Sequence, residues 1–140
     1  MITQSRISAF ATVLLVSCTA CAVPLPEHDP NMAWIDVQAQ AGHQLSAQRI
    51  DGHKVNDARY FQVTPGAHQL QVRLTYERSG NSRGDSQRRC LVDIAYPEFT
   101  ADHRYSIRAL AKGWTVRAWL YNSDGQRIIE SKPVRCGSQY

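Results

Sequence analysis

The stretch that decides the fold reads HQLQVRLTYE, residues 68–77. Every second side chain is apolar or aromatic apart from the leading histidine, and polar side chains fill the positions between them. Because successive side chains of a strand point to opposite faces of a sheet, this period of two predicts a half-buried β-strand. Pro65 and Gly66 stand just before it and predict a turn, since proline fixes φ and glycine tolerates positive φ.

The same alternation recurs along the chain, with turn signals between the segments. Further strands are expected in AWIDVQ (33–38), LSAQRI (45–50), ARYFQVT (58–64), CLVDIAY (90–96), RYSIRALA (104–111), WTVRAWLYN (114–122) and QRIIES (126–131). No ten-residue segment has convincing helical spacing. Seven or eight short strands predict an all-β fold: a small single-domain antiparallel β-sandwich of immunoglobulin-like type, with a small barrel as the alternative.

Length and composition agree with one globular domain preceded by other segments. The chain has 140 residues, of which 43% are hydrophobic and 20% charged. We divide it into a signal peptide at 1–17, a proline-rich tether at 18–32 and a β-sandwich domain at 33–140. The signal peptide is predicted because Arg6 precedes a short apolar run and then small residues. That run is too short to span a bilayer as a helix.

The residues after this apolar run carry a resemblance. LVSC, residues 15–18, resembles the lipobox of bacterial lipoproteins. The resemblance implies cleavage before Cys18 and acyl chains such as palmitate on that cysteine. Thr19 in the next position resembles the sorting pattern of outer-membrane lipoproteins. The implied location is the outer membrane of the cell envelope, with the domain facing the periplasm.

A second cleavage site competes with the first. ACA at residues 20–22 fits the small-x-small rule for ordinary secretory cleavage. Cleavage after Ala22 would remove both Cys18 and Cys21 and release a soluble periplasmic protein. The fate of Cys21 therefore depends on where the cut falls, and both alternatives stay open at this point.

Cys90 and Cys136 are the two cysteines of the predicted domain. An exported protein meets an oxidising compartment, in which two domain cysteines usually pair. We predict a disulfide that ties the C-terminal strand to the strand opened by Cys90. On the loop-entropy model it stabilises the fold by roughly 3–4 kcal/mol.

A second resemblance concerns the strand and turns around the opening stretch. Residues 50–76 resemble the PEGA-type β-sandwich modules of bacterial envelope proteins, through Asp51-Gly52, Pro65-Gly66 and His68. The resemblance implies an envelope accessory module and transfers no catalytic residue.

Motifs for catalysis or metal binding are absent from the sequence. The sequence contains no nucleophile elbow, phosphate-binding loop or pair of carboxylates. Its histidines do not have the spacing of metal ligands; they are His28, His43, His53, His68 and His103. We expect neither an enzyme nor a metal or other cofactor. His68 beside the turn is expected to pack or hydrogen bond there.

The most promising partner-binding residues lie in the segment 114–122. Its alternation puts Arg117, Trp119 and Tyr121 on an outer face, where aromatic and arginine side chains are suited to a partner. Removing Arg6 with the signal peptide leaves 15 basic and 12 acidic residues, a net charge of +3. The excess is spread along the sequence, so nucleic acid is not expected. RGD (83–85) lies in a polar loop and is interpreted as solvated.

These observations predict a lipid-anchored, non-enzymatic binding or scaffolding module that contacts an envelope protein or a cell-wall polymer. A soluble periplasmic accessory or inhibitor protein is the alternative.

Overall fold

The structure is a computed structural model that describes residues 21–77 and 87–136. The predicted signal peptide, Cys18 and the RGD loop lie outside these ranges. Within them the chain forms ten strands and no helix: β1 (Ala33–Gln38), β2 (His43–Ile50), β3 (His53–Lys54), β4 (Tyr60–Val63), β5 (Gly66–Glu77), β6 (Gln87–Phe99), β7 (Arg104–Lys112), β8 (Thr115–Tyr121), β9 (Arg127–Glu130) and β10 (Val134–Arg135). Since β3 and β10 have only two residues each, eight longer strands remain.

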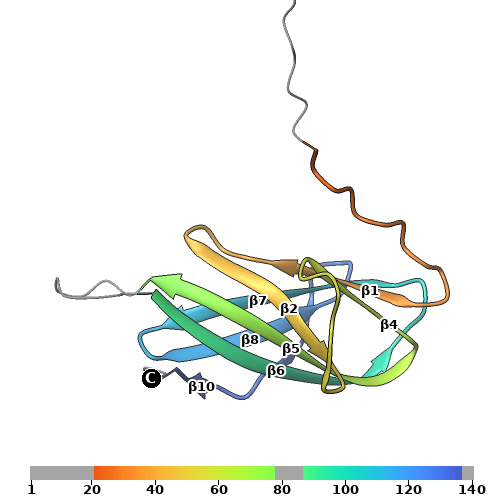
Figure 1. Ribbon diagram of the computed structural model, residues 1–140. Helices are drawn as coiled ribbons and strands as arrows, with labels where there is room; N and C mark the ends of the chain where they lie inside the picture. The colour runs from red at the N-terminus through yellow and green to blue at the C-terminus, as the bar shows by residue number, and fades with distance from the viewer. Residues whose placement is uncertain (1–20, 78–86, 137–140) are drawn as a thin grey trace, which may run out of the picture.

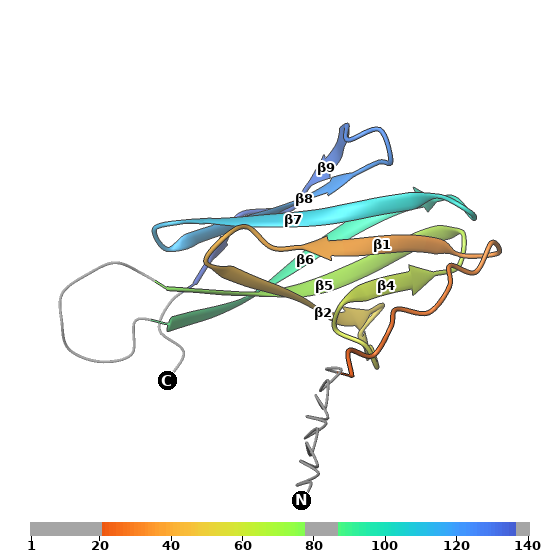
Figure 2. The ribbon, with the colours of Figure 1, turned by 90° about the horizontal axis from the view of Figure 1, so that it is seen from above.

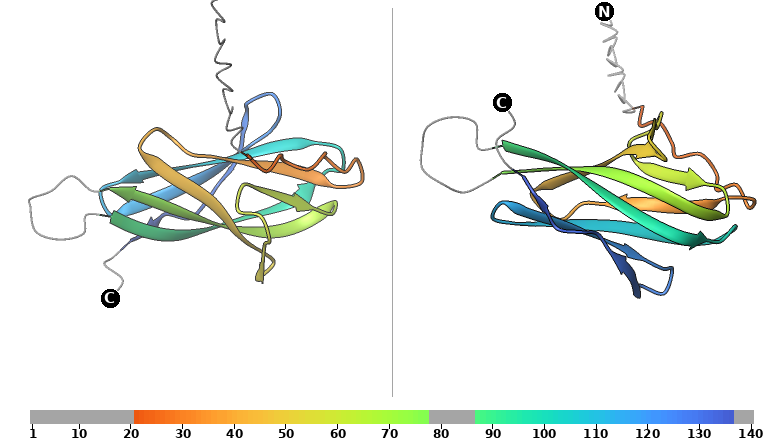
Figure 3. Two further views of the ribbon diagram at one scale, coloured as in Figure 1. Left: turned by 45° about the horizontal axis from the view of Figure 1, so that its top comes forward. Right: turned by 90° about the horizontal axis from the view of Figure 1, so that it is seen from below.

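The strands form two sheets packed face to face (Figures 1 and 3). One has the order β10-β8-β7-β1-β4, with β9 also paired to β8, and the other has the order β3-β2-β5-β6. The predicted all-β sandwich is therefore confirmed. Among the described strands, only β1 and β7 pair in parallel, from Trp34 opposite Arg104 to Gln38 opposite Arg108. A parallel pair is allowed here because the chain crosses to the other sheet between these two strands.

The stretch 68–77 forms most of β5, an interior strand of the four-stranded sheet. It pairs with β2 on one side and with β6 on the other. Leu70, Val72 and Leu74 are fully buried, and the polar residues between them face outward. Gly66 begins the strand at φ 115°, a backbone conformation that side chains other than glycine rarely adopt.

The hydrophobic core lies between the two sheets. The four-stranded sheet contributes the inward side chains of β5 together with Val92 and Ile94 of β6. The six-stranded sheet contributes the matching alternate residues, which are Ala33, Ile35, Phe61, Val63, Tyr105, Ile107, Ala109, Val116, Ala118 and Leu120. Burial of these side chains is the main source of stability, since each removes apolar surface from water.

Trp34 keeps the expected alternation but is buried on the outer face of its sheet. It faces away from the core between Ala33 and Ile35, and yet its exposed fraction is 0%. Its ring stacks on Tyr60 at a centroid distance of 4.2 Å, and the Arg104 guanidinium carbon lies 5.4 Å from the ring centroid. Its Nε1–H donates to Asp36 Oδ1 at 2.7 Å. Neighbouring strands therefore cover Trp34 on the outer face of the sheet.

The predicted disulfide joins the two sheets. Cys90 in β6 is bonded to Cys136, which directly follows β10, and their Cα atoms are 5.7 Å apart. One detail of the expectation was wrong: Cys90 does not open its strand, because β6 already begins at Gln87 and pairs there with Glu77. Pro97 lies inside β6, which forms an edge of its sheet, where a missing backbone N–H is tolerated.

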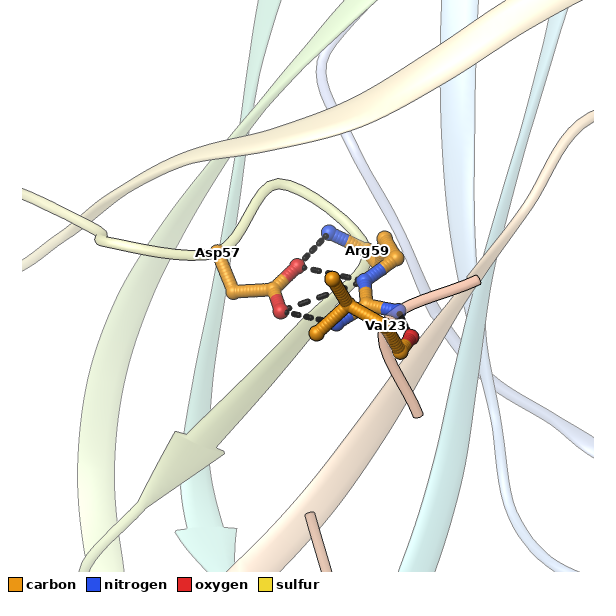
Figure 4. A network of polar contacts seen from close by, with 3 residues as sticks. All are labelled: Val23, Asp57 and Arg59. Carbon is orange, nitrogen blue, oxygen red and sulfur yellow. Dashed lines mark hydrogen bonds and ion pairs between the residues drawn. The ribbon is translucent and has the colours of Figure 1, made fainter. Parts of the chain in front are cut away.

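The described part of the tether, residues 21–32, contacts the domain at several points: the Asp102 backbone N–H donates to the Met32 carbonyl oxygen at 3.0 Å, and the His28 ring lies 6.1 Å from that of Trp34. Arg59 Nη1 donates to the Val23 carbonyl oxygen at 2.8 Å, and Gln62 Nε2 lies 3.3 Å from Met32 Sδ. Asp57 orients Arg59 by accepting from its Nε and Nη2 at 2.9 and 2.6 Å (Figure 4). The segment therefore runs back past β4, the edge strand of the six-stranded sheet (Figure 2).

Candidate binding face

The predicted partner-binding residues lie on the outer face of β8. The strand alternates strictly, so Val116, Ala118 and Leu120 are fully buried while Arg117, Trp119 and Tyr121 face away from the core. Trp119 and Tyr121 are half-buried by their neighbours on this face, and Arg117 retains 51% of its side-chain exposure. The structure thus places the three residues side by side along one strand.

Arginines from the neighbouring strands cover the aromatic rings. The Arg108 guanidinium carbon on β7 lies 4.6 Å from the Tyr121 ring centroid, and that of Arg127 on β9 lies 5.0 Å from the Trp119 centroid. A cation over a ring face is attracted by the ring quadrupole, by about 0.5–1 kcal/mol at an exposed site. This contact holds the planar guanidinium in one orientation. The Nε–H of Arg108 donates to Gln38 Oε1 at 3.1 Å, so its Nη groups are the donors left for a partner.

Positive charge is concentrated on this side of the six-stranded sheet. We define the arginine face by the outward residues of β7, β8 and β9: Arg104, Arg108, Leu110, Lys112, Arg117, Trp119, Tyr121 and Arg127. Two carboxylates accompany its five cations: Glu130 Oε1 accepts from Arg117 at 3.0 Å, and Asp36 lies 3.8 Å from Arg104. The surplus on this face equals the net charge of the chain after removal of residues 1–17.

A shallow depression of about 530 Å³ lies at one end of the arginine face. Leu110 and Trp119 provide its apolar lining, and Lys112, Thr115 and Arg117 provide polar groups. Leu110 is one of the few large hydrophobic residues that stay exposed, at 36% of its surface. The depression therefore offers an apolar contact flanked by cations, which is the arrangement found in binding sites for amphipathic anions.

Trp119 also carries an unused hydrogen-bond donor. Its Nε1 is shielded from solvent and has no acceptor within the described residues. A buried donor without an acceptor costs about 1–3 kcal/mol.

His68, Asp51 and Thr64 form a second polar cluster, at the turns of the four-stranded sheet. His68 Nδ1 lies 2.6 Å from Asp51 Oδ2, and His68 Nε2 lies 3.1 Å from Thr64 Oγ1. The order carboxylate, imidazole, hydroxyl is that of a catalytic triad. Nε2 is also 2.8 Å from the Thr64 carbonyl oxygen, so the imidazole lies against the backbone of this turn as well as against the hydroxyl.

The three groups around the imidazole, which are the Asp51 carboxylate, the Thr64 hydroxyl and the Thr64 carbonyl, all belong to turn residues. The cluster therefore acts as a structural clamp between two turns, in line with the expected role of His68. Asp51 also accepts from the Gln69 backbone N–H at 2.8 Å. This bond, followed by the one to His68, lowers the pKa of the Asp51 carboxyl below its usual value.

The remaining histidines do not converge on a ligand site in the described part of the chain. His28 contacts the Met32 carbonyl oxygen, and His103 contacts that of Ala101. No group of three or more His, Cys, Asp or Glu side chains within residues 21–77 and 87–136 is close enough to hold a metal ion. No helix in these ranges has the length and apolarity to cross a membrane.

Comparison with known proteins adds no relative. Family models, curated proteins and solved structures were each searched, and none gave a significant match to this chain.

The sequence did not identify Arg104, Arg108 and Arg127 as part of the candidate site. The first two stand four residues apart in the alternating segment 104–111, on the side opposite Tyr105 and Ile107. This four-residue spacing is the sequence pattern that could have identified them, because residues an even number apart in a strand lie on the same face. Their position beside β8 follows from the antiparallel pairing of β7 with β8, a hairpin whose two-residue loop begins with Gly113 at φ 62°.

Proposed function

We propose that this protein is an outer-membrane lipoprotein, anchored through acylated Cys18, whose β-sandwich binds an envelope partner through the arginine face. The observation that carries the binding role is the concentration of cations and aromatic rings on one side of the six-stranded sheet. Arginine, tryptophan and tyrosine dominate the binding energy of many protein interfaces. No catalytic step is proposed: among the described residues, the triad-like cluster of Asp51, His68 and Thr64 connects two turns and includes the Thr64 backbone carbonyl.

The anchor is supported by the apolar run, the LVSC motif and the proline-containing segment that follows. Two or three acyl chains hold a protein on a bilayer, whereas one alone binds reversibly. Cys18 and Cys21 provide a matched test. Cys18→Ser should abolish the acyl mass on the N-terminal peptide and release the protein from the membrane fraction, whereas Cys21→Ser should change neither.

The alternative, a soluble periplasmic accessory protein, predicts a different mass spectrum. Its N-terminal peptide would begin at Val23, without lipid, and both serine variants would fractionate as the unmodified protein does. That result would contradict the lipid anchor and leave the proposal for the arginine face intact.

The binding role is tested by chemical crosslinking in cells followed by purification of the protein. The double variant Arg108→Gln/Arg117→Gln removes two cations from the arginine face. The control Arg49→Gln/Arg73→Gln removes two exposed cations from the outer face of the other sheet. We expect the first variant to lose its specific crosslinked species by about tenfold and the control to keep them. Equal retention in both would contradict the proposal.

A further inference from the structure

We infer that the partner of the arginine face is an extended, acidic polypeptide segment with an apolar side chain between two carboxylates. This inference rests on the proposed binding function and goes beyond it, because it names the chemistry of the ligand. Three observations support it: arginine side chains cover the aromatic rings, the cations on β7 have a regular spacing, and a depression lies beside Leu110.

The aromatic rings are the first observation, and they disfavour a sugar polymer. A glycan surface offers open ring faces on which successive sugars stack. Here Arg108 covers a face of the Tyr121 ring, Arg127 covers a face of the Trp119 ring, and Trp34 is fully covered by Tyr60 and Arg104. Guanidinium edges are presented instead. The Nε–H of Arg108 is taken by Gln38, and the pair of Nη groups on its other edge matches the two oxygens of a carboxylate.

The spacing on β7 is the second observation. Arg108, Leu110 and Lys112 occupy alternate positions, so all three face outward. The two cations are four residues apart, which corresponds to about 13 Å along a strand. An extended peptide that lies along β7 has the same repeat. It therefore presents carboxylates to Arg108 and Lys112 when these acids are also four residues apart.

The depression is the third observation, and it selects the residue between the acids. Leu110, which stands between Arg108 and Lys112 on β7, forms its apolar lining together with Trp119, which pairs with Arg108. Lys112 and Arg117 are the cations that line it, and Arg117 lies directly opposite Leu110. An apolar side chain at the central position of the peptide enters it and covers Leu110. The resulting recognition pattern is acidic, any, apolar, any, acidic.

The test uses the full processed protein and a short synthetic peptide with glutamate, leucine and glutamate at alternate positions. Its matched control replaces both glutamates with glutamine. We expect the acidic peptide to bind at least tenfold more tightly than the control, with chemical shift changes at Leu110 and Trp119. Arg108→Gln and Lys112→Gln should each weaken binding severalfold, whereas Arg49→Gln should not.

Two further probes examine the other ligand classes. A neutral oligosaccharide of N-acetylated sugars and vesicles containing phosphatidylglycerol are titrated under the same conditions. Tighter binding of either probe than of the acidic peptide would overturn the inference, as would equal binding of the glutamate and glutamine peptides. Absence of binding by all probes would also overturn it. The crosslinking experiment is independent of these probes, so failure here is distinguishable from failure of the proposed function.

Discussion

His68 Nδ1 lies 2.6 Å from Asp51 Oδ2, and this contact joins the turn after β2 to the third residue of β5. Asp51 occupies the left-handed region at φ 48°, followed by Gly52 at φ 83°, as expected for an Asp-Gly hairpin turn. His68 also contacts the Thr64 carbonyl oxygen through Nε2. Asp51 and His68, 17 residues apart in the sequence, therefore link the turn after β2 to the turn at Thr64.

Removal of the Asp51 charge should make the free energy of unfolding depend less on pH in the acid range. The pKa of this carboxyl is lowered in the folded protein, so its stabilising contribution is complete above about pH 4 and is lost as pH falls through the lowered value. Asp51→Asn keeps a residue that tolerates positive φ and removes the charge. Because the side chain is 45% exposed, we expect a loss of at most about 1 kcal/mol at neutral pH.

The measurement is the free energy of unfolding by urea between neutral pH and about pH 3. Asp102→Asn is the matched control, because Asp102 also has positive φ, at 59°. We expect the acid slope to decrease more in Asp51→Asn than in the control. Identical slopes in the two variants would show that the clamp contributes nothing to the pH dependence.

Loss of the inter-sheet disulfide should destabilise the protein strongly. The bond closes a loop with a sequence separation of 46 residues, for which the loop-entropy model gives roughly 3–4 kcal/mol. Cys90→Ala/Cys136→Ala should therefore lower the free energy of unfolding by about this amount, measured by urea denaturation under non-reducing conditions. A loss below about 1 kcal/mol would mean that the two sheets hold the C-terminal segment without the bond.

Loss of the Arg59 contact should release the N-terminal segment from the domain. Arg59 holds the Val23 carbonyl oxygen, and the exposed Glu27 lies between this contact and β1. Arg59→Gln should increase the rate of cleavage after Glu27 by a glutamate-specific protease severalfold. The control Arg49→Gln removes an exposed arginine that bonds to Gln71 on the other sheet. Equal cleavage rates in all three proteins would contradict a docked segment.

Truncation of a core side chain on β5 should lower the free energy of unfolding. Leu74 is fully buried between the two sheets. Leu74→Ala should cost about 2–5 kcal/mol, since it leaves a cavity in addition to the lost burial. Thr75→Ala, on the outward side of the same strand, is expected to change stability by less than about 1 kcal/mol. Similar losses in both variants would contradict the assignment of the two faces.

The strands with strict alternation were predictable from the sequence. In β5, β7 and β8 the period of two identifies the buried face, because only one side of each strand meets the core. The alternation does not say what lies on the other face. The burial of Trp34 depends on Tyr60 and Arg104, which reach it only after β1 pairs with β4 and β7.

Part of the candidate site was predictable, because local alternation determines which side chains of a strand face outward. The outward positions of Arg117, Trp119 and Tyr121 follow from local alternation, and the contact of His68 with a turn follows from its place beside Pro65-Gly66. The arginines that cover the rings come from other strands, so their contribution depends on strand order. Likewise, no local signal links Arg59 to Val23, because a side chain that bonds a distant backbone carbonyl has no sequence pattern.

The most direct test of the arginine face compares two exposed leucines on opposite sheets. Leu110 on β7 and Leu91 on β6 have similar exposed fractions, 36% and 41%. A photo-crosslinking amino acid is placed at one position or the other, and the cells are irradiated. We predict a discrete crosslinked partner from position 110 that is lost in the Arg108→Gln/Arg117→Gln background, and none from position 91. Equal crosslinking from both positions, or crosslinking from position 91 alone, would contradict the account.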